Sequence, residues 1–113
     1  MDKTAALTCL SALAHETRLD ILRLLIAEGP EGLPARAIGD QVAAPASRLS
    51  FHLSALETAG LVRAMRRGRQ IFYAADRATM GGMIGYLMDD CCARDETVRA
   101  CCQHPAALPG DQG

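Results

Sequence analysis

The sequence is poor in aromatic residues and has no long apolar run. Its 113 residues include two Phe, two Tyr and no Trp, although half of all residues are hydrophobic. A core of Leu, Ile, Val, Ala and Met suits packed helices, and this length fits one domain. No apolar run approaches the roughly 18 residues that cross a bilayer, and the N-terminus shows no secretory signal pattern. We therefore expect a cytoplasmic protein with no membrane partner.

The chain also lacks an acid–base or nucleophile constellation, so we expect no catalytic residues and no enzyme. Its net charge is only −1, but the charge is unevenly spread. Residues 47–77 carry six arginines against two acidic residues, whereas the segments on either side are net negative. Because a local basic segment can bind phosphates in a chain of low net charge, this distribution favours a nucleic-acid partner.

The apolar periodicity predicts a mainly α fold with a β-hairpin. Helical spacing predicts five helices, over residues 4–14, 16–28, 34–43, 46–59 and 77–90. Alternating residues predict two strands, over residues 61–66 and 69–75. This order is typical of a winged helix-turn-helix. We expect this domain to span residues 1–90, followed by a cysteine segment at 91–102 and a disordered tail at 103–113.

The helix at 46–59 has the character of a DNA-reading helix. On a helical wheel Leu49, Leu53 and Leu56 face the core. The other sides carry small hydroxyls, a guanidinium and a phenyl ring, which suit contacts in a major groove: Ser47, Arg48, Ser50, Phe51 and Ser54. His52 lies at the edge of the apolar face, so both a structural role and a contact with DNA remain open.

The predicted hairpin is basic around its turn. The stretch RAMRRGRQIFY carries four arginines and no acidic residue. Such a hairpin fits a wing that lies along the phosphate backbone. The wing residues expected to contact DNA are Arg66, Arg67 and Arg69.

Three stretches resemble the ArsR/SmtB family of metal-sensing repressors. They are LSALAHETRLDILRLL (10–25), LSFHLSALETAGLV (49–62) and RRGRQIFYAA (66–75), and the likeness covers about residues 7–90. The resemblance implies a winged-helix homodimer whose first and last helices form the interface. It also implies a repressor that an inducer releases from its operator.

The chain departs from familiar members of that family in three places. Glu16 stands where a Pro is common, and Phe51 stands where an Arg is common, which puts one DNA contact in doubt. The stretch at 31–38 has no Cys-x-Cys box of the arsenic-sensing type, and the last helix has no His of the zinc-sensing type. Members with adjacent cysteines just after the last helix resemble the chain more closely.

Four of the five cysteines are clustered within twelve residues: Cys91, Cys92, Cys101 and Cys102. In a reducing compartment such a cluster indicates metal, metalloid or redox chemistry. Trivalent arsenic is thiophilic and takes three ligands, which Cys91, Cys92 and one of the second pair can supply. Zinc fits less well, because closed zinc sites favour C-x₂₋₄-C pairs. Cys9 lies in an apolar helix, so we expect a buried side chain, with a contact across the dimer as the alternative.

The sequence therefore predicts a dimeric transcriptional repressor that trivalent arsenic (arsenite) or antimonite releases from operator DNA, with no organic cofactor. A thiol-redox or persulfide sensor and a zinc- or cadmium-responsive repressor are the alternatives within the same fold. A thiol oxidoreductase or metal chaperone fits poorly, since a βαβ context around the cysteines is missing. An apolar stripe on the last helix is expected at the dimer interface: Met80, Met83, Ile84, Leu87 and Met88.

Overall fold

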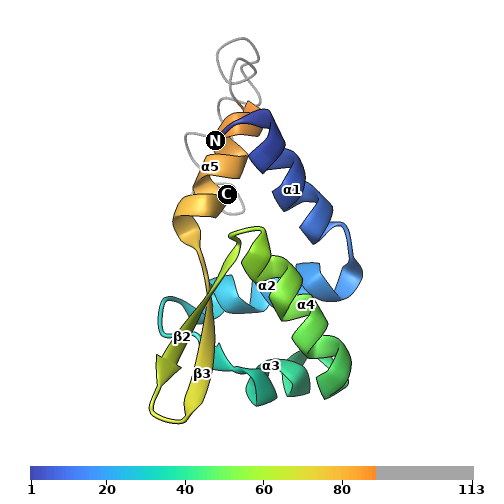
Figure 1. The fold of residues 1–113 in the computed structure, drawn as a ribbon, viewed down its shortest axis with the longest axis vertical. Helices are drawn as coiled ribbons and strands as arrows, with labels where there is room; N and C mark the ends of the chain where they lie inside the picture. Colours follow the sequence, from blue (N-terminus) through green and yellow to red (C-terminus); the bar gives the residue numbers. More distant parts are fainter. Residues whose placement is uncertain (89–113) are drawn as a thin grey trace, which may run out of the picture.

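The computed structural model describes residues 1–88, and residues 89–113 lie outside the described part. The described residues form five helices and three short strands, shown in Figure 1. In chain order they are α1 (Lys3–Leu13), α2 (Glu16–Glu28), β1 (Leu33–Pro34), α3 (Ala35–Val42), α4 (Ala46–Thr58), β2 (Val62–Arg67), β3 (Gln70–Ala75) and α5 (Arg77–Met88). The five helices and the hairpin confirm the predicted winged helix-turn-helix.

The core lies between α2, α3, α4 and the base of the hairpin. Its largest fully buried side chains are aliphatic: Ile21, Leu25, Ile38, Leu53, Leu56, Leu61 and Val62. Leucine and isoleucine interdigitate without a polar group that needs a partner, and each contributes about 1.5–3 kcal/mol when buried. A chain with few aromatic residues thus builds a continuous aliphatic core, with Tyr73 packed against it.

The sheet contains one strand that the sequence analysis did not predict. Its order is β1-β3-β2, and both pairings are antiparallel. In β1, Leu33 lies opposite Tyr73 and Pro34 lies opposite Phe72. Two residues are too few to show a strand periodicity, and Pro34 also donates no ladder hydrogen bond. The strand depends instead on Gly32, whose φ is +73° and whose position leaves no space for a side chain beside the Tyr73 carbonyl.

The helices α1 and α5 lie side by side at the end of the molecule opposite α3 and the hairpin turn (Figure 1). Within α5, Met83 is buried, whereas Ile84 and Leu87 are exposed to 45% and 46%. No helix within residues 1–88 is both long and apolar enough to pass through a bilayer. The expected extension of the last helix to residue 90 lies outside the described residues.

We predict that Gly32→Ala lowers the free energy of unfolding by about 2 kcal/mol or more, because a positive φ strains alanine and the added Cβ clashes with β3. An ideal Cβ at this position would lie 2.5 Å from the Tyr73 carbonyl oxygen. Gly68→Ala is the matched control, since Gly68 has a φ of +64° but open space around it. Denaturant unfolding of both variants measures the difference. An equal loss in the two variants would show that the close approach costs nothing.

Candidate nucleic-acid interface

The helices α3 and α4 form the helix-turn-helix. They are joined by a three-residue turn in which Ala43 adopts a left-handed φ of +55° and Pro45 precedes the first residue of α4. Pro45 fixes its own φ and blocks continuation of α3, so the chain changes direction here. No side chain caps the start of α4. Its first backbone N–H groups are therefore available to a phosphate or a base edge.

The exposed face of α4 carries the residues that the helical wheel selected. The leucines Leu49, Leu53 and Leu56 are buried in the core. The five predicted contact residues are all exposed: Ser47, Arg48, Ser50, Phe51 and Ser54. Phe51 is exposed to 64%, so its ring does not pack into the core of this chain. This face of α4 can therefore approach DNA.

His52 does not belong to that face. Its side chain is only 7% exposed, and its Nδ1 accepts a hydrogen bond of 3.1 Å from Nε of Arg18 on α2. The ring also lies beside His15, with 4.5 Å between the ring centroids. Because His52 is buried and already bonded to protein, it is removed from the predicted DNA-contacting set. Of the two roles that the sequence left open for His52, its surroundings support the structural one.

The surroundings of His52 also oppose its protonation. Burial is the main cause that lowers the pKa of His52, and the nearby positive charges of His15, Arg18 and Arg48 lower this pKa further. The neutral ring has one acceptor nitrogen, and Nδ1 uses it for Arg18. Since a protonated ring would have no acceptor left, a cationic His52 cannot keep this hydrogen bond.

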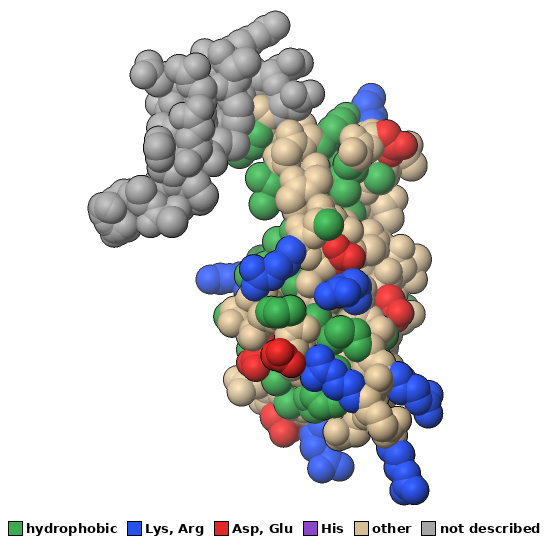
Figure 2. Space-filling model, turned by 90° about the vertical axis from the view of Figure 1, so that its left-hand side faces the viewer, with side chains coloured by type: hydrophobic (Ala, Val, Ile, Leu, Met, Phe, Trp, Pro, Cys, Tyr) green, Lys and Arg blue, Asp and Glu red, His purple; other side chains and the backbone are tan. Residues whose placement is uncertain are grey.

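The wing presents arginines on both faces of the hairpin. The strands β2 and β3 are joined by the two-residue turn Gly68-Arg69, and the φ of +64° at Gly68 is what a type II′ turn requires of its first central residue. Side chains alternate along a strand, so Arg66 and Arg67 point to opposite faces. All three predicted wing residues, Arg66, Arg67 and Arg69, are exposed. Figure 2 shows Lys and Arg side chains gathered toward this end of the molecule.

Arg67 already has two partners within the protein. Its Nη2 lies 3.6 Å from Oε1 of Glu31, which comes just before β1. Its Cζ lies 4.9 Å from the centre of the Phe72 ring on β3. An exposed ion pair of this kind is worth about 1 kcal/mol or less, so a phosphate can displace Glu31. Glu31 therefore acts against DNA binding by Arg67.

Arg36 is a further basic residue at this surface, and the sequence analysis did not single it out. It lies in the first turn of α3 and shares an open groove of about 440 Å³ with Arg69 of the wing. The groove also borders the uncapped N-terminus of α3, where backbone N–H groups favour an anion. The pairing of Arg36 with the wing is long-range, so the local sequence contained no signal for it. We add Arg36 to the candidate DNA contacts.

Cys9 is buried, as predicted, and only 1% exposed. Its thiol donates to the carbonyl oxygen of Ala59, 3.4 Å away. Burial raises the pKa of Cys9, which disfavours the thiolate. Cys9 therefore packs α1 against the end of α4 inside one chain.

The four clustered cysteines, Cys91, Cys92, Cys101 and Cys102, lie outside the described residues. Within residues 1–88 no three His, Cys, Asp or Glu side chains come together in a group that could hold a metal ion. The proposed ligands thus remain a prediction from the sequence.

The fold and this exposed basic face define the winged helix-turn-helix class of proteins. A family described as a helix-turn-helix domain matches residues 13–63. No curated protein matches the chain. Among solved structures, an ArsR-like transcriptional regulator from Rhodococcus sp. RHA1 is 27% identical with a TM-score of 0.70, and the match covers 88% of this chain and 92% of that chain.

Two further structures extend this likeness. The homodimeric winged helix-turn-helix DNA-binding domain of Mb0332 from Mycobacterium bovis, a possible ArsR-family transcriptional regulator, is 30% identical with a TM-score of 0.60, over 80% of this chain and 87% of that one. A possible transcriptional regulator for arsenical resistance is 28% identical with a TM-score of 0.60, over 72% of this chain and 80% of that one. The chain belongs to the ArsR family of winged-helix transcriptional regulators.

We predict that the stability of the protein falls as the pH drops below about 6.5, the ordinary pKa of histidine, in part through His52. The folded-state pKa of His52 is lowered, so between that pKa and about 6.5 the unfolded chain binds more protons than the folded one. His52 therefore contributes its full stability above about pH 6.5 and loses it on acidification. Denaturant unfolding of the wild type and of His52→Asn, compared between about pH 5 and pH 8, should show a weaker pH dependence in the variant. His15→Asn, which keeps a side-chain cap on α2 but removes one of the charges that lower the pKa of His52, should weaken the pH dependence only in part. An unchanged pH dependence in His52→Asn would contradict the assignment.

We predict opposite effects on DNA binding for Arg67→Ala and Glu31→Gln. The first removes a phosphate partner and should reduce the slope of log K against log salt by about 0.9. The second releases Arg67 from its acidic neighbour and should strengthen binding by about two- to threefold at low salt, since the pair is exposed. Fluorescence anisotropy with a labelled duplex over a salt series measures both. Equal affinities in Glu31→Gln and the wild type would show that the ion pair does not compete with DNA.

Proposed function

We propose that the chain is a homodimeric repressor that binds operator DNA and is released when trivalent arsenic or antimony binds its C-terminal cysteines. The observation that carries the DNA-binding part is the exposed polar face of α4 beside a wing with arginines on both faces. In a helix-turn-helix protein the second helix enters the major groove. The serines of α4 have small side chains that allow the helix to approach the bases closely. Arg48 offers a donor to guanine or phosphate.

The groove between α3 and the wing adds a contact to the phosphate backbone. Arg36 and Arg69 reach it from two different elements, so one phosphate can meet two guanidinium groups. Such contacts fix the register of the protein on the duplex but do not read its sequence. In this proposal α4 supplies specificity, and the wing with Arg36 supplies most of the affinity.

The dimer is proposed from the apolar surface of α1 and α5. Large apolar side chains are exposed along these two neighbouring helices: Leu7, Leu10, Ile84 and Leu87. A Cβ added at Gly81 or Gly85 would meet nothing within 4 Å. These two glycines are one turn apart on α5 and leave room for close approach of a second helix. The homodimeric relative of 30% identity supports a dimer.

The choice of inducer is proposed from ligand chemistry. Thiolates are the preferred ligands of trivalent arsenic and antimony, and Cys91, Cys92, Cys101 and Cys102 offer up to four of them. When bound, the metalloid supplies a crosslink between thiolates. Cys91 and Cys92 offer the first pair, and Cys101 or Cys102 the third ligand. The similarity to a possible regulator for arsenical resistance supports this inducer.

The proposed inducer site is joined to the proposed interface by the chain itself. Cys91 follows Met88, the last described residue of α5, after only two residues. A ligand that draws Cys91 and Cys92 toward a later cysteine therefore acts directly on the end of the interface helix. A change in the packing of α5 then alters the spacing of the two α4 helices in the dimer.

We predict that Leu87→Glu shifts the protein from dimer to monomer at about ten micromolar, because a carboxylate in an apolar interface is left without a partner. Sedimentation velocity measures the change. Ala78→Glu is the matched control, because it adds the same charge at an exposed position in the first turn of α5, away from Leu87. A wild type that sediments as a monomer at this concentration would overturn the dimer.

We predict that replacing both Cys91 and Cys92 with Ser leaves operator affinity within about twofold of wild type but abolishes release by arsenite, since a hydroxyl is a hard, poor ligand for a soft ion. Double replacement of Cys101 and Cys102 should also abolish the arsenite response, yet can preserve a response to methylarsenite, which needs two thiolates. The measurement is release of a labelled duplex during parallel titrations with arsenite, antimonite, methylarsenite, zinc, cadmium and persulfide. Cys9→Ala is the control and should respond normally.

The same titrations decide between the proposed inducer and its alternatives. Release by persulfide alone would indicate a redox sensor, and release by zinc or cadmium alone would indicate a metal sensor of the same fold. Wild-type response to arsenite in the variant that lacks Cys91 and Cys92 would exclude these residues as ligands. Loss of DNA binding by that variant without any inducer would show that the cysteines are structural.

A further inference from the structure

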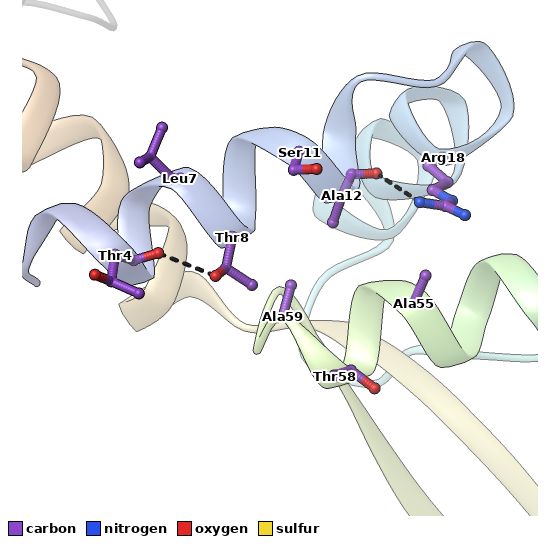
Figure 3. A pocket seen from close by; sticks show the side chains of 9 residues that line it. All are labelled: Thr4, Leu7, Thr8, Ser11, Ala12, Arg18, Ala55, Thr58 and Ala59. Carbon is purple, nitrogen blue, oxygen red and sulfur yellow. Dashed lines mark hydrogen bonds between the residues drawn. The ribbon is translucent and has the colours of Figure 1, made fainter.

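One guanidinium connects the three helices α1, α2 and α4. Arg18 lies in the first turn of α2, and its Nε donates to Nδ1 of His52 on α4 over 3.1 Å. Its Nη1 donates to the carbonyl oxygen of Ala12 near the end of α1 over 3.4 Å. Figure 3 shows Arg18 at one end of the groove that separates α1 from α4, with its bond to Ala12. The side chain of Arg18 thus bridges two helices that do not follow each other in the chain.

The same guanidinium also lies over the exposed ring of Phe51 on α4. Its Cζ lies 5.3 Å from the centre of the Phe51 ring. Phe51 and His52 are adjacent on α4, and one is exposed while the other is buried. Arg18 therefore contacts α4 on both sides of the boundary between its core face and its solvent face. The planar guanidinium has donors at fixed angles, so its contacts restrict how α4 can rotate about its own axis.

We propose that Arg18 is a positioning residue for operator recognition, which acts through His52 and Phe51 and does not itself contact DNA. It fixes the rotation of α4 relative to α1, and hence the direction in which Arg48 and the serines of α4 point. Because α1 belongs to the proposed dimer surface, Arg18 also joins that surface to the recognition helix. The inference rests on the proposed DNA binding of α4 and is independent of the identity of the inducer.

A positioning residue and a phosphate contact differ in what their loss does to specificity. Loss of a phosphate contact weakens binding to all sequences and reduces the salt dependence. Loss of the correct rotation of α4 weakens the contacts with bases, whereas the charge at the interface stays the same. The ratio of affinities for a selected and an unselected duplex therefore separates the two roles.

The test uses the full chain and two labelled duplexes of equal length, one enriched by the wild type from a random pool and one unselected. We expect Arg18→Ala to weaken binding to the enriched duplex about tenfold, the loss of one charge-assisted hydrogen bond, with less than about twofold change on the unselected duplex and an unchanged salt slope. Arg18→Lys should recover only part of the loss, since an ammonium lacks the planar fork. Arg23→Ala, which removes an exposed arginine of the same helix, is the control and should show no loss of specificity.

Variants of the partner residue test whether Arg18 acts through His52. His52→Phe, which removes the acceptor, should reproduce the loss, and the double variant with Arg18→Ala should lose no more than either single variant. His52→Asn, which keeps an acceptor near the position of Nδ1, should retain specificity. Fully additive losses would overturn the connection between the two residues.

Two outcomes would overturn the positioning role. Equal loss on both duplexes with a salt slope reduced by about 0.9 would make Arg18 a phosphate contact. A lower free energy of unfolding with unchanged affinity and specificity would make it only structural.

If the wild type enriches no duplex, the proposed DNA-binding function fails, and amide hydrogen exchange of the free protein then tests whether Arg18 positions α4. Exchange in α4 that is about tenfold faster in Arg18→Ala than in Arg23→Ala supports the positioning role, and equal exchange overturns it.

Discussion

The burial of one leucine face of α4 is the constraint on which the rest of the structure depends. Leu49, Leu53 and Leu56 lie one helical turn apart and are buried against the core. Replacement of one such leucine with alanine costs about 2–5 kcal/mol, several times more than any exposed ion pair. The core therefore decides which face of α4 is buried, and the rotation of about 100° per residue then places Ser47, Ser50 and Ser54 on the exposed side.

This dependence on local periodicity explains how much of the fold could be predicted. The helices and the hairpin follow from apolar spacing and from breaks such as Gly60, which act within a few residues. The strand β1 could not be predicted, because its two residues have no periodicity of their own. It exists because Gly32 allows the backbone to approach Tyr73, about forty residues away in the chain. Such a contact is a property of the folded chain and not of its local sequence.

The candidate site likewise combines features that one element sets by itself with contacts between distant elements. The exposed face of α4 and the arginines of the wing could be predicted, since each is set by the geometry of one element. The shared groove of Arg36 and Arg69 could not, because it joins two elements. The pairing of Arg67 with Glu31 and the hydrogen bond of Arg18 to His52 are equally long-range. His52 shows why the sequence alone was not sufficient. It lies at the edge of the helical wheel, and only the residues that pack against it place it on the buried face.

The recognition surface and the proposed interface lie toward opposite ends of the molecule (Figure 1). An inducer that acts beyond α5 must therefore affect α4 through the helices between them. Allosteric coupling in proteins is typically about 1–3 kcal/mol, and one hydrogen bond to a charged group contributes about 1.5–3 kcal/mol. A change at a single such contact is thus large enough for the switch. Arg18 has the required position, since it bonds both α1, which belongs to the proposed interface, and the recognition helix α4. A small movement of α1 in the dimer is consequently sufficient to change the rotation of α4, with no need to unfold any element.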